Sequence, residues 1–213
     1  MRIQTCILGR IRTNCYIITN EETNEAIIID PADQAEEIEK LLKEQVLIPV
    51  AILLTHGHFD HIMAASALAH DYNIPVYASE LEKELLADPR MNCSESMSRS
   101  ISLIPNISLK DNEILSLVGI NITVIHTPGH TAGGLCYYFF DNAVLFSGDT
   151  LFFESTGRTD FPTGNAKCLL ESIHNKLMTL SDEVKVYPGH GTSTTIGYER
   201  SNNPYLSEEG FWE

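Results

Sequence analysis

In the first part of the chain, short apolar runs typical of buried strands alternate with longer periodic stretches typical of helices. Residues 15–19 and 26–30 are β-branched runs separated by a polar segment, which predicts a hairpin. In residues 33–45 apolar positions recur every three or four residues among acidic ones, which predicts a helix with Asp33 as its N-cap. Residues 50–54 form another apolar run, which predicts a core strand.

The rest of the chain continues this alternation. The further predicted helices are residues 62–70, 80–87, 165–180 and 195–202. The further predicted strands are residues 75–78, 114–118, 120–125, 135–140, 144–146 and 184–187. Residues 88–106 have no clear period, which predicts a loop region. This order predicts an α/β fold with two layers of sheet covered by helices, in a single domain over residues 1–213.

The charge of the chain argues against nucleic acid as a partner. The formal net charge is −15, from 29 acidic and 14 basic residues. Nucleic-acid binding normally uses lysine and arginine to displace counterions from the phosphates. We therefore expect no nucleic-acid partner, and the charge disfavours an RNA-processing nuclease.

The cysteines and the apolar runs bear on where the protein works. The five cysteines are scattered and form no C-x-x-C pair, which indicates neither a disulfide framework nor a structural zinc site. The first residues lack the pattern of a signal peptide. No apolar run approaches the roughly 20 residues that a membrane span needs. We therefore expect a cytoplasmic protein with no membrane partner.

Side chains that can bind a metal follow four of the predicted strands. They lie in the segments T-H-G-H-F-D-H, T-P-G-H-T, S-G-D-T and P-G-H-G, and the candidate ligands are His56, His58, Asp60, His61, His130, Asp149 and His190. Strands packed side by side bring such ends together, and a glycine lets the backbone bend closely around an ion. Imidazoles with carboxylates and no thiolate suit borderline divalent metals.

The density of these candidates indicates two ions. One turn, residues 56–61, supplies four candidate ligands, which is more than a single ion usually takes from one segment. Asp149 is the natural bridge, because one carboxylate can give an oxygen to each ion. We therefore expect two divalent ions, zinc first, with iron or manganese also compatible with this ligand set.

The other three histidines are less suited to this role. His70 lies late in a predicted helix and is expected to be solvated, and His174 is expected to be structural. His126 is compatible with packing or with support of the neighbouring His130. Tyr137 and Tyr138 follow a strand pattern, which favours core packing for both.

The order of the four motifs resembles that of the metallo-β-lactamase superfamily over nearly the whole chain. The resemblance implies an αββα sandwich, that is, two mixed β-sheets flanked by helices with the metals at one edge. It also implies a first metal held by His56, His58 and His130, a second held by Asp60, His61 and His190, and Asp149 as the bridge between them.

Within that superfamily the chain resembles the short bacterial hydroxyacylglutathione hydrolases (glyoxalase II). The resemblance lies in G-R-T-D-F-P-T-G-N at residues 157–165. Arg158 stands where longer enzymes place a basic residue that contacts glutathione, so Arg158, Thr159 and Asp160 are the candidate substrate-binding residues. A surface ion pair is the alternative for Arg158. Longer enzymes have a tyrosine in place of Asp160 and a C-terminal helical domain, for which the segment after His190 is too short.

The expected activity is hydrolysis of a small-molecule thioester of the S-lactoylglutathione type by a hydroxide that bridges the two ions. Asp60 is the candidate catalytic residue, since it can both bind metal and orient the hydroxide, and Arg158 would position the anionic end of the substrate. The leaving thiolate needs no dedicated general acid, because thiols are comparatively acidic. The oligomeric state stays open.

Four alternatives belong to other classes. A persulfide dioxygenase, an oxidoreductase of the same superfamily, would hold one iron through His56, His130 and Asp149, the two-histidine, one-carboxylate arrangement. A secreted β-lactamase is disfavoured by the missing signal peptide and by the Asp60–His61 pair. The nuclease is disfavoured by charge. A binding module without catalysis would hardly need seven ligands.

Overall fold

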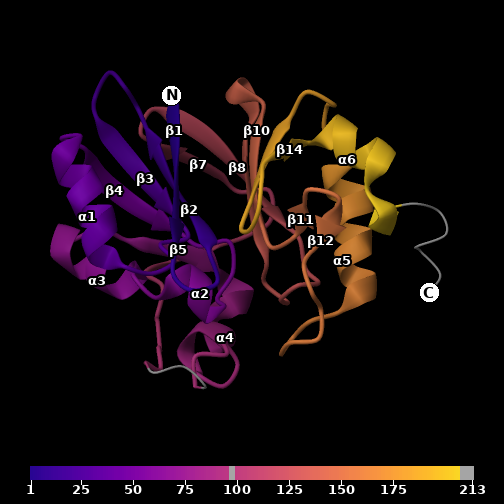
Figure 1. The fold of residues 1–213 in the computed structure, drawn as a ribbon, viewed down its shortest axis with the longest axis horizontal. Coiled ribbons are helices and arrows are strands. Elements are labelled where there is room, and N and C mark those ends of the chain that lie inside the picture. Colours follow the sequence, from indigo (N-terminus) through magenta and orange to yellow (C-terminus); the bar gives the residue numbers. More distant parts are fainter. Residues whose placement is uncertain (96–98, 207–213) are drawn as a thin grey trace.

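Two mixed β-sheets of six strands each form the centre of the computed structural model, which describes residues 1–95 and 99–206 (Figure 1). The strands of the first sheet, in spatial order, are β1 (Arg2–Leu8), β2 (Thr13–Thr19), β3 (Glu25–Ile29), β4 (Ile48–Leu53), β5 (Val76–Ser79) and β6 (Ile107–Leu109). The first three strands are antiparallel, and β3 to β6 are parallel.

The second sheet has the spatial order β14-β13-β10-β9-β8-β7. Its strands are β7 (Ile114–Leu117), β8 (Ile120–His126), β9 (Leu135–Phe139), β10 (Val144–Gly148), β13 (Lys185–Pro188) and β14 (Thr194–Thr195). Only β10 and β13 pair in parallel. A small ribbon of β11 (Leu151–Phe152) and β12 (Ser155–Thr156) follows β10.

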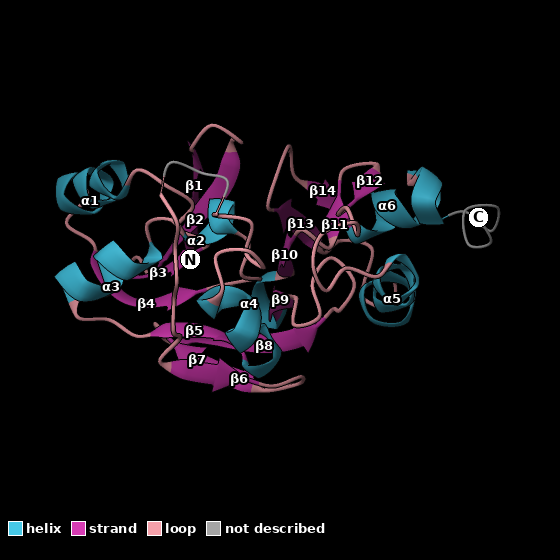
Figure 2. Ribbon diagram, turned by 90° about the horizontal axis from the view of Figure 1, so that it is seen from below, coloured by secondary structure: helices cyan, strands magenta, loops and turns pink. Residues whose placement is uncertain are grey.

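Helices cover the outer face of each sheet, so the molecule has four layers (Figure 2). The first sheet is covered by α1 (Ala35–Glu44) and α3 (Ala65–Tyr72). The second is covered by α5 (Ala166–Ser172), a π-helical turn (Ile173–Leu177) and α6 (Ile196–Asn202). The short α2 (Phe59–Ile62), the 3₁₀ turn η1 (Glu80–Glu82) and α4 (Lys83–Ala87) lie at one end of the sandwich (Figure 1), and a final 3₁₀ turn is Pro204–Leu206.

The core between the sheets follows from the alternation of side chains along each strand. In β3, Ile27 and Ile29 face the second sheet, whereas Ile28 between them packs under α1 and α3. In β9, Tyr137 points between the sheets and Tyr138 points toward α5. Because successive residues of a strand face opposite sides, strands buried on both faces need apolar residues at nearly every position. The predicted core packing of both tyrosines is confirmed.

The predicted αββα fold class is confirmed, and the boundaries differ in a few places. Asp33 is not the N-cap of α1, which was predicted wrongly. Gln34 occupies that position with a left-handed backbone (φ 52°), and the Asp33 side chain accepts a hydrogen bond from the Gln34 amide at 2.8 Å. The sequence shows an acidic residue before a helix, but not the backbone angle that moves the cap by one position.

Two predicted helices are more divided than their apolar period indicates. The segment predicted as 62–70 forms α2 and α3 with a break between them, and the 165–180 helix changes to π geometry at Ile173, where the Met178 amide bonds to the Ile173 carbonyl at 2.8 Å. Residues 88–106 contain no helix or strand where the structure describes them, and residues 96–98 lie outside the described part. In the described ranges, no helix is long and apolar enough to cross a membrane.

Candidate metal centre

The candidate ligands lie in loops that follow four strands, at one edge of the sandwich. The loop after β4 carries His56, His58, Asp60 and His61, and the loops after β8, β10 and β13 carry His130, Asp149 and His190. The strands β8, β10 and β13 run in the same direction, so their carboxyl ends meet at one edge. A bridge between Thr13 and His190 joins this edge to the first sheet.

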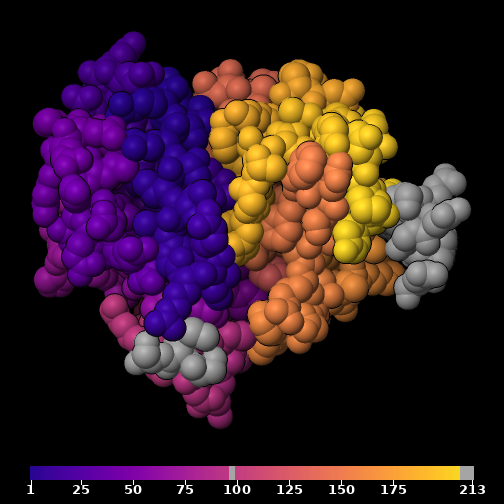
Figure 3. Space-filling view, viewed as in Figure 1, coloured from indigo at the N-terminus to yellow at the C-terminus, as the bar shows by residue number. Residues whose placement is uncertain are grey.

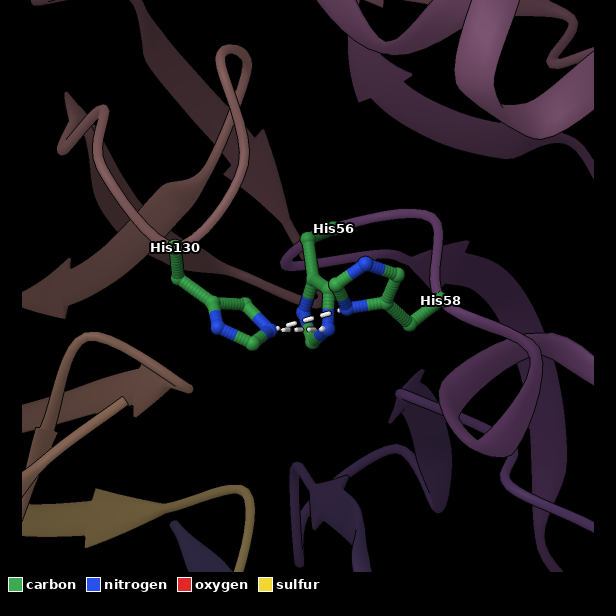
Figure 4. Close-up of side chains that lie close together, drawn as sticks. All are labelled: His56, His58 and His130. Carbon is green, nitrogen blue, oxygen red and sulfur yellow. Dashed lines mark hydrogen bonds between the residues drawn. The ribbon is translucent and has the colours of Figure 1, made fainter. Parts of the chain in front are cut away.

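Three histidines form the first cluster, and their ring nitrogens converge (Figure 4). His130 Nε2 lies 2.9 Å from His58 Nδ1 and 3.2 Å from His56 Nε2. The three residues are buried, with at most 4% of their surface exposed. His130 Nδ1 contacts the Arg158 carbonyl at 2.7 Å, so the opposite nitrogen is the one left facing its partners. Three imidazoles around one point form a set of nitrogen ligands.

Asp60, His61 and His190 form a second cluster beside the first. Asp60 Oδ2 lies 3.2 Å from His190 Nε2 and 3.7 Å from His61 Nε2. The short helix α2 places Asp60 and His61, while the Thr13 hydroxyl donates to Asp60 Oδ2 at 3.0 Å. The far side of the His61 ring is held by Asp30, whose Oδ2 lies 2.9 Å from Nδ1. This cluster is therefore fixed from two sides.

Asp149 lies between the two clusters. Its Oδ2 is 3.6 Å from His130 Nε2 and 3.6 Å from His190 Nε2, and its Oδ1 is 3.4 Å from His61 Nε2. One carboxylate thus reaches a member of each cluster. The structure brings together all seven residues that the sequence singled out, and His70, His126 and His174 belong to neither cluster.

Unpartnered polar atoms support metal binding at this point. Among the described residues, His61 Nε2 and Asp149 Oδ1 are buried without a hydrogen-bond partner. Buried polar groups are normally hydrogen-bonded, because an unmade bond costs about 1–3 kcal/mol. Imidazole nitrogen and carboxylate oxygen are ligands for zinc and for iron. The residues therefore fit one or two divalent ions.

The protonation states suit the same purpose. Burial, reinforced by neighbouring imidazoles, holds the pKa of His56 well below its ordinary value and lowers the pKa of His58 to about 3. Burial alone would raise the pKa of Asp60 and Asp149, but the imidazoles around them lower both. Burial alone would lower the pKa of His61, and three carboxylates raise it instead. Neutral imidazoles and ionised carboxylates are the forms that bind metal, so the shifts at His56, His58, Asp60 and Asp149 favour binding, whereas His61 has to release a proton when an ion binds.

A glycine allows the close approach of the last ligand loop. A Cβ at Gly189 would lie 2.2 Å from Asp149 Oδ1 and 2.7 Å from His61 Cε1, closer than any side chain tolerates. Asn14 of β2 holds the backbone on both sides of His190. Its side-chain amide donates hydrogen bonds to the carbonyls of Pro188 and Gly191, at 2.9 Å each. The loop that carries His190 therefore lies directly against the other ligands.

A cavity of about 740 Å³ opens onto both clusters. Besides ligands, its lining residues are Ile11, Phe59, Arg90, Cys93, Glu95, Phe152, Ser155, Thr156, Arg158 and Phe161. Ile11 and three phenylalanines form its apolar walls, and two arginines and Glu95 are its charged groups besides the ligands. The space-filling view shows the N-terminal half of the chain meeting the C-terminal half along one face (Figure 3). Such a cavity has room for a small-molecule substrate.

Of the three candidate substrate-binding residues, only Arg158 lines this cavity. Its guanidinium forms two hydrogen bonds to Asp160, at 2.7 and 2.6 Å, and lies 3.9 Å from the centre of the Phe161 ring. Asp160 therefore holds the guanidinium of Arg158 in place and does not itself line the cavity. Thr159 lines a separate surface hollow against α5. The surface ion pair considered for Arg158 is present, and the same arginine faces the cavity.

Several site residues were missed by sequence reasoning. Asp30, Thr13 and Asn14 support the second cluster, and Phe59 and Phe152 line the cavity. A signal existed for Asp30, which directly follows the apolar run Ile27–Ile29 in the same way that the ligands follow their strands. For the others the role depends on contacts across the fold.

The comparisons with known proteins agree with this geometry. The chain belongs to the metallo-β-lactamase superfamily, whose family model matches residues 8–190. The probable metallo-hydrolase YqgX of Bacillus subtilis is 37% identical over 94% of this chain and 95% of its own length. Hydroxyacylglutathione hydrolase GloC of Haemophilus influenzae is 35% identical over 98% of this chain and 100% of its own. These names support a metal-dependent hydrolase.

Two solved structures extend the comparison. The structure titled BLEG-1 B3 metallo-β-lactamase has a TM-score of 0.92 and 42% identity, and covers 97% of this chain and 100% of that one. TTHA1623, solved in a di-iron-bound form, has a TM-score of 0.85 and 36% identity, and the match covers 95% of this chain and 100% of that one. TTHA1623 is thus a protein of this fold that has been solved with two iron ions.

Proposed function

We propose that this protein is a metal-dependent thioesterase that hydrolyses S-lactoylglutathione or related hydroxyacyl-thiol esters. The observation that carries the proposal is the position of Asp149, whose two oxygens face members of both ligand clusters at the floor of one cavity. Two divalent ions held there would supply a water ionised near neutral pH and would polarise a carbonyl oxygen. Zinc is the expected ion, with iron or manganese as the alternatives.

The chain's own residues orient the reaction. Asp60 reaches His190 and accepts a hydrogen bond from Thr13, so one of its oxygens is fixed at the centre. We propose that Asp60 orients the attacking water as well as binding metal. The leaving thiolate departs without a protonated side chain, because thiols are comparatively acidic.

The cavity explains the choice of an anionic acyl thioester. Phe59, Phe152 and Phe161 offer apolar surface for the acyl and thiol chains. Arg158 offers a cation at the rim of a protein whose net charge is −15. Because Arg158 is paired with Asp160, an anionic substrate would have to replace Asp160 or share the guanidinium with it. The name of the GloC relative supports the same substrate class.

We place this activity in the cytoplasm and expect no nucleic-acid or membrane partner. All five cysteines are free thiols, which is the ordinary state in a reducing compartment. The acidic charge argues against polyphosphate partners.

A persulfide dioxygenase remains the second candidate, and one geometric feature favours it. His130 Nε2 lies within 3.6 Å of both His56 Nε2 and Asp149 Oδ2, so these three residues could hold a single iron. Two histidines and a carboxylate leave open positions for oxygen on iron. β-Lactams are a third substrate class to test, because BLEG-1 is described as a B3 metallo-β-lactamase.

The deciding experiment is an assay of metal-analysed protein with S-lactoylglutathione and with a β-lactam under anaerobic conditions, followed by an oxygen-uptake assay with glutathione persulfide in aerated buffer. Two ions per chain with thiol release would support the thioesterase. One iron per chain, no thiol release and oxygen uptake with the persulfide would favour the dioxygenase. Turnover of the β-lactam alone would overturn both.

A further inference from the structure

A buried carboxylate outside the ligand set connects the two loops of the first cluster. Glu82, at the end of η1, is 1% exposed. Its Oε2 accepts a hydrogen bond from the Gly57 amide at 2.9 Å, and its Oε1 accepts one from the Gly133 amide at 2.7 Å. Each oxygen of one side chain therefore holds a different segment of backbone.

These two segments carry the three histidines. Gly57 lies between His56 and His58, and Gly133 follows His130 by three positions. The first segment follows β4 of one sheet, and the second precedes β9 of the other sheet. The carboxylate of Glu82 therefore fixes how far apart the two loops lie.

The fit around Glu82 is close. A Cβ at Gly133 would lie 2.7 Å from Glu82 Cγ and 2.8 Å from Glu82 Oε1, so glycine is needed for the amide to reach the carboxylate. Hydrogen bonds from amides to an ionised carboxylate are stronger than those between neutral groups. A neutral glutamine would present one oxygen and one NH₂ group, and the NH₂ group would face an amide that is also a donor.

We propose that Glu82 is a positioning residue that sets the geometry of the His56, His58 and His130 cluster through the backbone of both loops. The second cluster has separate supports, since Asp30 holds His61 and Thr13 holds Asp60. A change at Glu82 should therefore weaken one metal site and leave the other. This inference rests on the metal centre of the proposed function.

The test is a metal titration of the full chain after chelator treatment, with cobalt(II) as the probe. Absorption of bound cobalt reports the ligand geometry, and the His58→Ala and His190→Ala variants give reference spectra for each site alone. In Glu82→Gln we expect the affinity of the first site to fall about 10- to 100-fold, the usual effect of losing a group that orients metal ligands. The affinity of the second site should stay as in the unaltered protein.

Glu199→Gln is the matched control. Glu199 is also fully buried and accepts hydrogen bonds from Glu154, Thr194 and Asn203, but it contacts none of the ligand loops. This variant should keep both metal affinities. If Glu82→Gln does not fold, Glu82→Asp is measured in the same way, because its shorter side chain reaches at most one of the two amides.

The outcomes separate the two proposals. The role of Glu82 would be overturned if the measured Glu82 variant bound cobalt at the first site as tightly as the unaltered protein. It would also be overturned if Glu199→Gln lost as much affinity as Glu82→Gln. Neither result would affect the metal centre. An unaltered protein that binds no cobalt would overturn the metal centre itself, and with it the inference.

Discussion

His61 Nδ1 lies 2.9 Å from Asp30 Oδ2, across 31 positions of sequence. Both groups are almost completely buried, and Asp30 also accepts hydrogen bonds from the amide and hydroxyl of Thr55 at 2.8 and 2.6 Å. Asp30 therefore fixes the ring of a candidate ligand and the start of the loop that carries it.

Replacing Asp30 by asparagine should weaken metal binding at the Asp60, His61 and His190 cluster. The amide keeps the shape but loses the charge that orients the His61 ring, so we expect an affinity lower by about 10- to 100-fold. Competition with a chelator measures this metal affinity. Asp111→Asn is the control and should leave this affinity unchanged, because it weakens a surface ion pair with Lys176 while its side-chain oxygen can still accept from the His126 amide.

Removing a ligand should remove an ion and the activity together. His58→Ala leaves two nitrogens in the first cluster, and Asp149→Ala removes the carboxylate that lies between both clusters. We expect at least one metal ion fewer per chain in each variant, by elemental analysis, and no measurable thioester hydrolysis. A fully active variant that keeps all its metal would contradict the site assignment.

Arg158→Ala should raise KM and leave kcat nearly unchanged. The side chain is more than half exposed, so water screens its charge and we expect only a small rise in KM, roughly fivefold at most. Steady-state kinetics at low and high salt measures KM and kcat of both proteins. Lys167→Ala, an exposed cation away from the cavity, is the control. An equal effect in both variants would show that only the net charge matters.

Asn14→Ala should destabilise the protein and loosen the loop of His190. The buried amide donates to two loop carbonyls, and unmaking these bonds costs about 1–3 kcal/mol. Urea denaturation of the metal-free protein measures the loss. Asn202→Ala, whose exposed side chain bonds only within α6, should cost less than about 0.5 kcal/mol.

Cys15 and Cys136 should resist thiol reagents in the folded protein. Both are completely buried, and burial raises the pKa of Cys136 to about 11, so little of the reactive thiolate exists at pH 8. Labelling followed by peptide mass spectrometry should find both modified only after denaturation. Labelling of either at the rate of the partly exposed Cys168 in folded protein would contradict this packing.

The positions of the candidate ligands could be predicted from sequence because each lies just after an apolar run. His130, Asp149 and His190 follow strands of one sheet that run in the same direction, so a local pattern was enough to place them at one edge. β1 was missed because it is an edge strand with mostly partial burial, which weakens its apolar alternation. The π-helical turn after Ser172 likewise leaves no local mark in the sequence.

The supporting groups could not be predicted in the same way. Glu82 bonds to residues 25 and 51 positions away, and its own sequence context is an ordinary acidic helical turn. The ion pair of Arg158 with Asp160 is local, but its position over Phe161 and beside the cavity depends on how the loop folds back. Such roles depend on long-range packing rather than on local pattern.

The candidate ligands come from both sheets, since the loop after β4 belongs to one and the loops after β8, β10 and β13 to the other. An ion held between them would tie the two halves of the sandwich together, and by mass action it would stabilise the folded chain by about 2.7 kcal/mol at a free concentration 100 times its dissociation constant. A shortage of metal would then remove the activity and would also make the chain more susceptible to proteases. The abundance of this protein in a cell should follow the metal supply.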